Sequence, residues 1–191
     1  MSAPPPGSFP PDEENPWTTR STRVVYENPW IRVEENQVIR PDGEPGIYGV
    51  VYPSHVALGV VPIEASGHIW LVGQHRYPLG RYSWEIPEGG GDPAADLRQE
   101  AARELREETG LTASRWEHLI DIHTSNCFTA ERAVIFLARD LTPGEALPEG
   151  CERLQLARIP FGEAVDAVAN GRITDGVSVA GILAAARRID G

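Results

Sequence analysis

The sequence predicts an α/β fold with a small β-rich appendage at its N-terminus. Two observations support this prediction. Short β-like segments bounded by turn residues lie on both sides of one long amphipathic pattern near residues 96–109. Two further helical patterns follow, at 161–169 and 177–188. With 191 residues, the chain is long enough for one buried core, with or without a small appended unit.

Charge and cysteine content exclude several classes of protein. The chain has 17 Lys and Arg against 28 Asp and Glu, a net charge of −11, and no basic stripe, so we expect no nucleic-acid partner. Cys127 and Cys151 are too few for a disulfide framework and lack the spacing of a metal site. No basic-then-apolar signal opens the sequence, and no run approaches the roughly 20 apolar residues of a membrane span. We therefore expect a cytoplasmic protein without a membrane partner.

The N-terminal part of the chain is predicted to contain a tail and a small sheet. Residues 1–15 are rich in proline and acid, which predicts disorder. Three β-like runs follow, separated by strong turn signals, at 22–26, 30–40 and 47–52. Because three strands without a helix make a poor independent domain, we expect residues 17–54 to form an antiparallel subdomain that packs on another subunit of a homodimer.

The segments 55–63 and 68–74 are apolar enough to be strands buried on both faces. Arg76 ends the second of them, and viewed alone it is equally well a surface residue. A short strand at 82–86 then leads into Gly89-Gly90-Gly91, which lets the backbone approach a ligand closely.

The long helical pattern carries two stripes of different chemistry. Leu97, Ala101 and Leu105 form an apolar stripe, and a second stripe is acidic: Glu100, Glu104, Glu107 and Glu108. Like charges one turn apart destabilise a helix by about 0.2–0.5 kcal/mol per pair. The stripe is therefore either a metal site for a hard cation such as Mg²⁺ or a solvated face with Arg103 pairing between the acids.

The ends of this helix are marked by capping residues. Both Asp92-Pro93 and Asp96 with Gln99 fit an N-terminus, and we favour Asp96. Gly110 suits the left-handed cap at the other end. Beyond it, strands are expected at 116–124, 132–138 and 153–159, with a polar loop at 140–149.

The segment from Gly89 to Leu111 resembles the signature of the Nudix hydrolases, G-x5-E-x7-R-E-U-x-E-E-x-G-U, where U is a bulky aliphatic residue. Its matching positions are Gly89, Arg103, Glu104, Leu105, Glu107, Glu108, Gly110 and Leu111. One position departs, because the first glutamate is replaced by Ala95. The resemblance implies a Nudix α/β/α sandwich with a central mixed sheet in residues 55–191, and the segment 17–54 resembles the N-terminal region of the ADP-ribose and nucleoside-diphosphate-sugar branch.

The resemblance also implies roles for individual residues. Glu104 and Glu108 would be the principal Mg²⁺ ligands, with Glu107 and the carbonyl of Glu88 beside them, and Mn²⁺ may substitute. Arg103 would orient these carboxylates. Arg76 would meet the diphosphate. The general base would lie on the loop 148–153, where Glu152 is favoured, Glu149 is second, and Glu107 remains as an alternative outside the loop.

The substrate is expected to be a nucleoside diphosphate sugar. Ser125-Asn126-Cys127-Phe128 departs from the Ser-Pro-Gly-Phe of members that prefer ADP-ribose, which favours GDP-mannose or a UDP- or ADP-hexose over ADP-ribose. Trp30 and Trp84 are candidates for stacking on the base, and each is equally well a core residue. A non-catalytic nucleotide-sensing module is the rival class, disfavoured because Glu104, Glu107 and Glu108 are all present.

Overall fold

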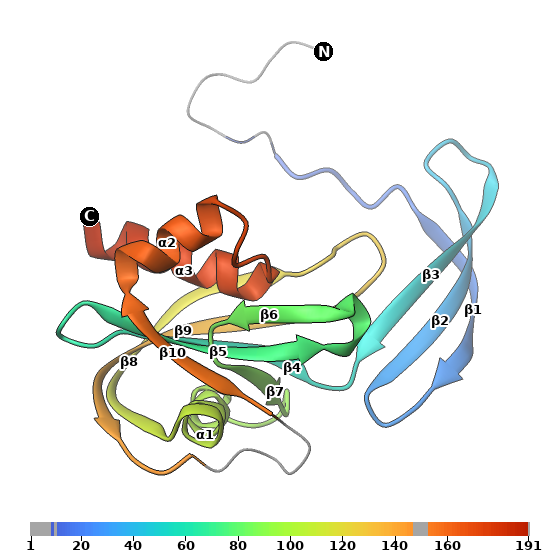
Figure 1. Cartoon of the computed structure of the whole chain (residues 1–191). Coiled ribbons are helices and arrows are strands. Elements are labelled where there is room, and N and C mark those ends of the chain that lie inside the picture. The colour runs from blue at the N-terminus through green and yellow to red at the C-terminus, as the bar shows by residue number, and fades with distance from the viewer. Residues whose placement is uncertain (1–8, 10, 147–152, 191) are drawn as a thin grey trace.

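A computed structural model describes residues 9, 11–146 and 153–190, so most of the segment predicted as a tail lies outside the described residues. The fold is α/β, as predicted, with a central mixed sheet and an extra antiparallel sheet at the N-terminus (Figure 1). No helix within the described part of the chain is long and apolar enough to cross a bilayer. The cytoplasmic location stays a prediction.

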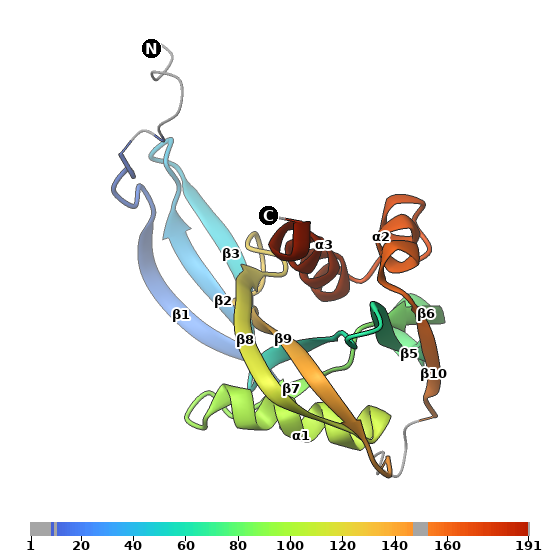
Figure 2. The ribbon, with the colours of Figure 1, turned by 90° about the vertical axis from the view of Figure 1, so that its left-hand side faces the viewer.

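The N-terminal sheet is a three-stranded antiparallel meander. Its strands are β1 (Thr18–Glu27), β2 (Ile31–Ile39) and β3 (Pro45–Pro53), in that order. It projects away from the rest of the molecule in both views (Figures 1 and 2). The end of β3 is tied to the loop after β8, because the Val51 amide donates to the Phe128 carbonyl at 2.8 Å and the Tyr48 hydroxyl to the Cys127 carbonyl at 2.6 Å.

Two further sheets build the main body. The larger has the order β7-β4-β9-β8 and is mixed, because β4 pairs with β9 in parallel and with β7 antiparallel. Its strands are β4 (Val56–Pro62), β7 (Glu88–Gly91), β8 (Leu111–His123) and β9 (Arg132–Pro143). The smaller has the order β10-β5-β6, from β5 (His68–Arg76), β6 (Arg81–Glu85) and β10 (Gln155–Pro160). A 3-10 turn, Tyr77–Leu79, joins β5 to β6.

Helices cover the mixed sheet on opposite faces, and the alternation of strand residues explains why (Figure 2). Leu58 and Val60 of β4 pack with Ala101 and Leu105 of α1 (Leu97–Thr109). Val61, on the other face of the same strand, belongs to the cluster that includes α3 (Gly176–Asp190). Residues of α2 (Phe161–Ala169) belong to that second cluster too.

The predicted caps of α1 are confirmed. Asp96 is the N-cap, its carboxylate accepting from the backbone amides of Arg98 and Gln99, and Gly110 is the C-cap with φ of 74°. The buried face is the predicted apolar stripe, with Ala101 and Leu105 fully buried. This register fixes which residues face the glycine segment.

Several boundaries differ from the sequence-based expectation, among them the start of β1, which lies at Thr18 rather than 22. Strand β8 begins at Leu111 rather than 116, and β9 runs to Pro143 into the segment expected as a polar loop. The reason is mutual pairing, since Leu111 lies opposite Pro143 and both Leu111 and Leu141 pack against the α1 cluster. The glycines expected as a loop form β7, because their backbone pairs with β4 without needing side chains.

Candidate active site

A cavity of about 410 Å³ brings together residues from four separate parts of the chain. Trp30 comes from the turn between β1 and β2, and His55 from the start of β4. Glu88, Gly89 and Gly90 come from β7, and α1 adds its acidic face. The full lining is Trp30, His55, Glu88, Gly89, Gly90, Arg103, Glu104 and Glu107. Seven of the residues singled out from the sequence therefore share one site: Trp30, Glu88, Gly89, Gly90, Arg103, Glu104 and Glu107.

Arg103 holds the acidic stripe together. Its guanidinium donates to Glu104 at 2.6 Å, to Glu107 at 2.5 Å and to Glu100 at 3.2 Å. It also donates to the Gly90 carbonyl at 3.3 Å. Partial burial by itself lowers the pKa of Arg103, but the charge of Glu104 and the bonds to Glu100 and Glu107 more than offset this and raise the pKa above its usual value. The arginine is therefore a fixed cation at the centre of the stripe.

Glu108 lies deeper than the other carboxylates. It is buried, with 4 % of its surface exposed, and it accepts a hydrogen bond from the backbone amide of Glu88 at 3.0 Å. This bond fixes the start of β7 against the last turn of α1. The carbonyl and side chain of Glu88 are thereby placed beside the carboxylates of the helix.

Gly89 leaves space that the helix occupies. A Cβ atom at this position would overlap the carboxylate of Glu104, so only glycine allows the backbone and this side chain to lie so close. The donors gathered here are all oxygens, which suits a hard divalent cation such as Mg²⁺. Among the described residues no three acidic, His or Cys side chains form a ready-made metal cluster. Glu104 and Glu107 are instead ion-paired with Arg103.

Glu88 continues into a buried polar network behind the cavity. Ser178 donates to the Glu88 carboxylate at 2.7 Å and accepts from the backbone amide of Ile86 at 3.0 Å. Burial raises the pKa of Glu88 well above its usual value, and the neighbouring Asp175 raises it further. Asp175 in turn accepts from the Ser178 amide at 2.7 Å. The start of α3 is thus bonded to the strand that carries the site.

Arg76 does not line this cavity but forms an ion pair with the buried Glu85. Its guanidinium donates to Glu85 at 2.6 Å, and Glu85 is 1 % exposed. Burial alone lowers the pKa of Arg76, whereas the bond to Glu85 and the charges of Glu88 and Asp175 raise it above its usual value. The arginine is fixed near the acidic centre and lines a separate cavity of about 690 Å³.

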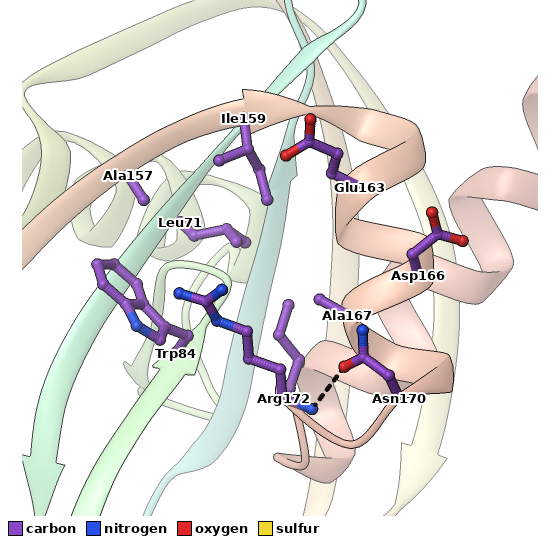
Figure 3. Close-up of a pocket in the computed structure, with 10 residues that line it drawn as sticks. Leu71, Trp84, Ala157, Ile159, Glu163, Asp166, Ala167, Asn170 and Arg172 are labelled. Atoms are coloured by element: carbon purple, nitrogen blue, oxygen red, sulfur yellow. Dashed lines mark hydrogen bonds between the residues drawn. The ribbon is translucent and has the colours of Figure 1, made fainter.

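The structure places Trp84 away from the carboxylates. It lines a cavity of about 290 Å³ between the small sheet and α2, together with Leu71, Ile159 and Arg172 (Figure 3). Its ring also contacts Tyr82 edge to face, with 5.7 Å between centroids. Trp30, in contrast, is 68 % exposed and lines the site, so the structure brings only one of the two candidate tryptophans to the carboxylates.

Two residues expected to act on the substrate, Glu149 and Glu152, lie outside the described residues. Four others were not singled out from the sequence, although the structure places them at the site or directly behind it: His55, Glu85, Asp175 and Ser178. Only Glu85 had a usable signal, as the last polar residue of a short strand that leads into the glycines.

Comparison with known proteins identifies the family. The model of the nucleoside diphosphate sugar hydrolase N-terminal domain matches residues 17–51, and that of the NUDIX domain matches residues 53–176. An ADP-ribose pyrophosphatase of Mycobacterium tuberculosis is 34 % identical over 176 residues, covering 90 % of this chain and 84 % of that protein. A CMP-5'-(N-acetyl-N-hydroxy-3-aminopropyl)phosphonate hydrolase of Streptomyces rubellomurinus is 31 % identical over 172 residues, covering 88 % and 81 %.

A solved structure of an ADP compounds hydrolase has the same fold, with a TM-score of 0.84, 20 % identity, and coverage of 95 % of this chain and 98 % of that one. The NUDIX match spans well over half of the chain and contains every carboxylate of the cavity. The chain therefore belongs to the Nudix family and is a pyrophosphohydrolase of its ADP-ribose and nucleoside-diphosphate-sugar branch.

Proposed function

We propose that this enzyme hydrolyses the diphosphate bond of ADP-ribose and related nucleoside diphosphate sugars, giving a nucleoside monophosphate and a sugar phosphate, with Mg²⁺ as cofactor. The observation that carries this proposal is the shared cavity, in which Trp30 of the N-terminal sheet faces the same space as Glu88, Glu104 and Glu107. A site with an aromatic platform at one side and oxygen ligands at the other matches a substrate with a base at one end and a diphosphate in the middle.

The residues divide the work as follows. Glu104 and Glu108 are the principal metal ligands, with Glu107 and the carbonyl of Glu88 beside them. A Mg²⁺ or Mn²⁺ ion held by these residues would supply charge neutralisation for the diphosphate and a lowered pKa for a water molecule. Arg103 positions the carboxylates that it contacts. The remaining activation free energy is lowered by positioning the reacting groups and by stabilising the charge of the transferred phosphoryl group.

Two side chains are assigned to the substrate itself. Trp30 stacks on the base, since its ring is exposed at the cavity and free of the core. Arg76 is proposed to meet the diphosphate from the neighbouring cavity that it lines, its guanidinium oriented by the buried Glu85. Trp84 takes no part in this proposal, because it lies in the cavity against α2.

Glu152 is the proposed general base, with Glu149 second and Glu107 third. General bases contribute about 10²- to 10⁴-fold, so Glu152→Gln should lower kcat by that order and leave Mg²⁺ and substrate affinity nearly unchanged. Glu149→Gln is the matched control, with the same change of charge three positions earlier. A collapse of kcat in the Glu149 variant alone would exchange the two roles, and full activity in both would move the role to Glu107.

A second candidate substrate class is GDP-mannose with the UDP- and ADP-hexoses. The sequence Ser125-Asn126-Cys127-Phe128 favours it through the absence of proline and glycine. The loop lies against the N-terminal sheet, since the Cys127 and Phe128 carbonyls accept from β3. ADP-ribose comes first because the relative from Mycobacterium tuberculosis, which is matched over most of both chains, is an ADP-ribose pyrophosphatase.

A substrate panel tests the function. Purified protein with Mg²⁺ should release AMP from ADP-ribose at a higher kcat/KM than it releases nucleotides from GDP-mannose, UDP-glucose, dinucleoside polyphosphates or nucleoside triphosphates. Chelation of the metal should abolish the release. A higher kcat/KM for GDP-mannose or UDP-glucose would favour the second class, and turnover of triphosphates alone would overturn both.

We also propose that the enzyme is a homodimer. The N-terminal sheet exposes Val24, Val25 and Tyr26 of its edge strand, each about half exposed in the single chain. A second copy of this chain that packs on the sheet would bury them.

A further inference from the structure

Ser54 connects the N-terminal sheet to the catalytic cavity. Its backbone amide donates to the Trp30 carbonyl at 2.9 Å. Its hydroxyl oxygen lies 2.9 Å from the Pro29 carbonyl, 3.0 Å from the Trp30 carbonyl and 3.0 Å from Nδ1 of His55. The position of Trp30 and that of His55 are therefore linked through one side chain.

These contacts select one tautomer of His55. The Ser54 hydroxyl has a single proton, and the two carbonyl oxygens near it can only accept. If that proton went to the imidazole, both carbonyls would face an oxygen lone pair. The hydroxyl therefore donates to a carbonyl and accepts from Nδ1–H of His55. Nε2 of the neutral ring is left as a hydrogen-bond acceptor.

His55 lies between two parts of the site. Its ring packs over Gly90 of β7, where an added Cβ would lie 3.3 Å from the His55 Cβ and 3.5 Å from its Cγ. Its neighbour Ser54 is bonded to Trp30. The same cavity is lined by Trp30, His55 and Gly90.

We propose that His55 is a substrate-binding residue that accepts a hydrogen bond from a hydroxyl of the nucleoside ribose. The inference rests on the proposed function, in which the base lies on Trp30 and the diphosphate at the glycines and carboxylates. In a nucleoside diphosphate the ribose joins these two groups, and His55 occupies the corresponding interval. Arg103 can only donate, and the carboxylates of Glu88, Glu104 and Glu107 lie on the diphosphate side of the cavity, on β7 and α1.

The test measures binding of nucleotides rather than turnover. AMP, 2'-deoxy-AMP and 3'-deoxy-AMP are titrated calorimetrically into wild type and into His55→Phe, which keeps a ring but has no acceptor. Wild type should bind AMP about 3- to 10-fold more tightly than one of the deoxy forms, as expected for one hydrogen bond. In His55→Phe this difference should disappear.

Two further variants keep the test decisive if His55→Phe does not fold. His55→Gln retains a carbonyl acceptor and should keep part of the ribose preference, whereas Ser54→Ala frees the tautomer and should reduce it. His118→Phe, an exposed histidine paired with Asp121 on β8, is the matched control and should leave the preference unchanged.

The outcomes separate this inference from the proposed function. If wild type binds AMP and both deoxy forms equally, or if His55→Phe keeps the preference, the role of His55 is overturned and the function stands. If AMP fails to bind but GMP or UMP binds, the same comparison with that nucleotide tests His55 while the adenine preference falls. If wild type binds none of the monophosphates, the nucleoside contact proposed for His55 is overturned, while the substrate panel decides the function.

Discussion

At the scale of single residues, the acidic stripe of α1 is stabilised by one arginine. Arg103 contacts Glu100, Glu104 and Glu107 and so offsets the repulsion expected among them. Glu100 lies one turn before Glu104, outside the lining of the cavity. Glu100 therefore supplies Arg103 with a carboxylate partner at the outer end of the stripe. In this chain Ala95 replaces the first glutamate of the signature.

The difference between Glu104 and Glu100 gives a matched pair of variants. Glu104→Gln should lower kcat/KM by about 10²- to 10³-fold, in line with the loss of one charge-stabilising group at a reaction centre. Glu100→Gln makes the same change in charge and also weakens a bond to Arg103, and it should cost less than 10-fold. Steady-state kinetics at several Mg²⁺ concentrations compare them, and equal losses in the two variants would contradict the assignment of Glu104 as a ligand.

Some residues of the site contact neighbours in the sequence, and others contact residues that are far away in the sequence. Helical periodicity predicts Glu104 and Glu107 on one face of α1, with Arg103 one turn before Glu107, and the resemblance to the Nudix signature implied their roles. The roles of His55 and Ser178 could not be predicted from the sequence. Their roles depend on Gly90 and on Ile86, which are distant in the sequence, and no local pattern distinguishes them from any exposed histidine or buried serine.

At the scale of elements, β7 is a glycine-rich strand whose backbone also lines the cavity, and we call this backbone the glycine platform. Its backbone is extended and pairs with β4, and the absence of side chains at the glycines allows α1 to approach. The sequence predicted the close approach, but the glycines were expected to form a loop, and glycine does lower strand propensity. The pairing with a buried, apolar β4 overrides that propensity.

Gly89→Ala tests the platform. The added methyl would overlap the Glu104 carboxylate, so we expect loss of at least about 10²-fold in kcat/KM, comparable to removal of the carboxylate itself. Gly162→Ala on α2 is the control, since a Cβ there meets nothing within 4 Å. Activity of Gly89→Ala close to that of the control would show that the helix and the strand separate without consequence.

An ion pair ties the turn before β5 to β10. Arg158 donates to Glu64 at 2.7 Å, and Ser66 and Trp70 also donate to this carboxylate. The bond to Arg158, followed by that to Ser66, lowers the pKa of Glu64 from 4.5 to about 2. Because the folded state depresses this pKa, the stabilisation is present above pH 4.5 and is lost as the pH falls toward 2.

Unfolding experiments follow this ion pair. In urea at pH 7, Glu64→Gln should lower the free energy of unfolding by about 1 kcal/mol or less, as expected for a pair at the surface. The difference from wild type should shrink as the pH is lowered from 4.5. Arg158→Gln should show the same shrinking difference, since it removes the main cause of the shift. A difference independent of pH would attribute the effect to lost packing instead.

At the scale of the whole molecule, the N-terminal sheet is attached at one end only. The described contacts join β3 to the loop at 124–131 and Ser54 to the turn before β2, whereas every residue of β1 is exposed. The register of β1 shifts between Val24 and Tyr26, and Val24 and Val25 are 51 % and 47 % exposed. Neither face of β1 is therefore covered within one chain.

A homodimer would remove this exposure. We expect light scattering to give about twice the mass of one chain, with residues 17–54 in the interface. Val24→Asp with Val25→Asp should shift the protein toward the monomer, because charges there would lie in a buried apolar contact. Leu183→Asp on α3, also exposed at 46 %, is the control and should leave the mass unchanged.

The monomeric variant should also have a raised KM, because Trp30 lies in the turn between two strands of the same sheet. A wild-type protein that remains a monomer at micromolar concentration would contradict the homodimer and leave the chemistry of the site unaffected.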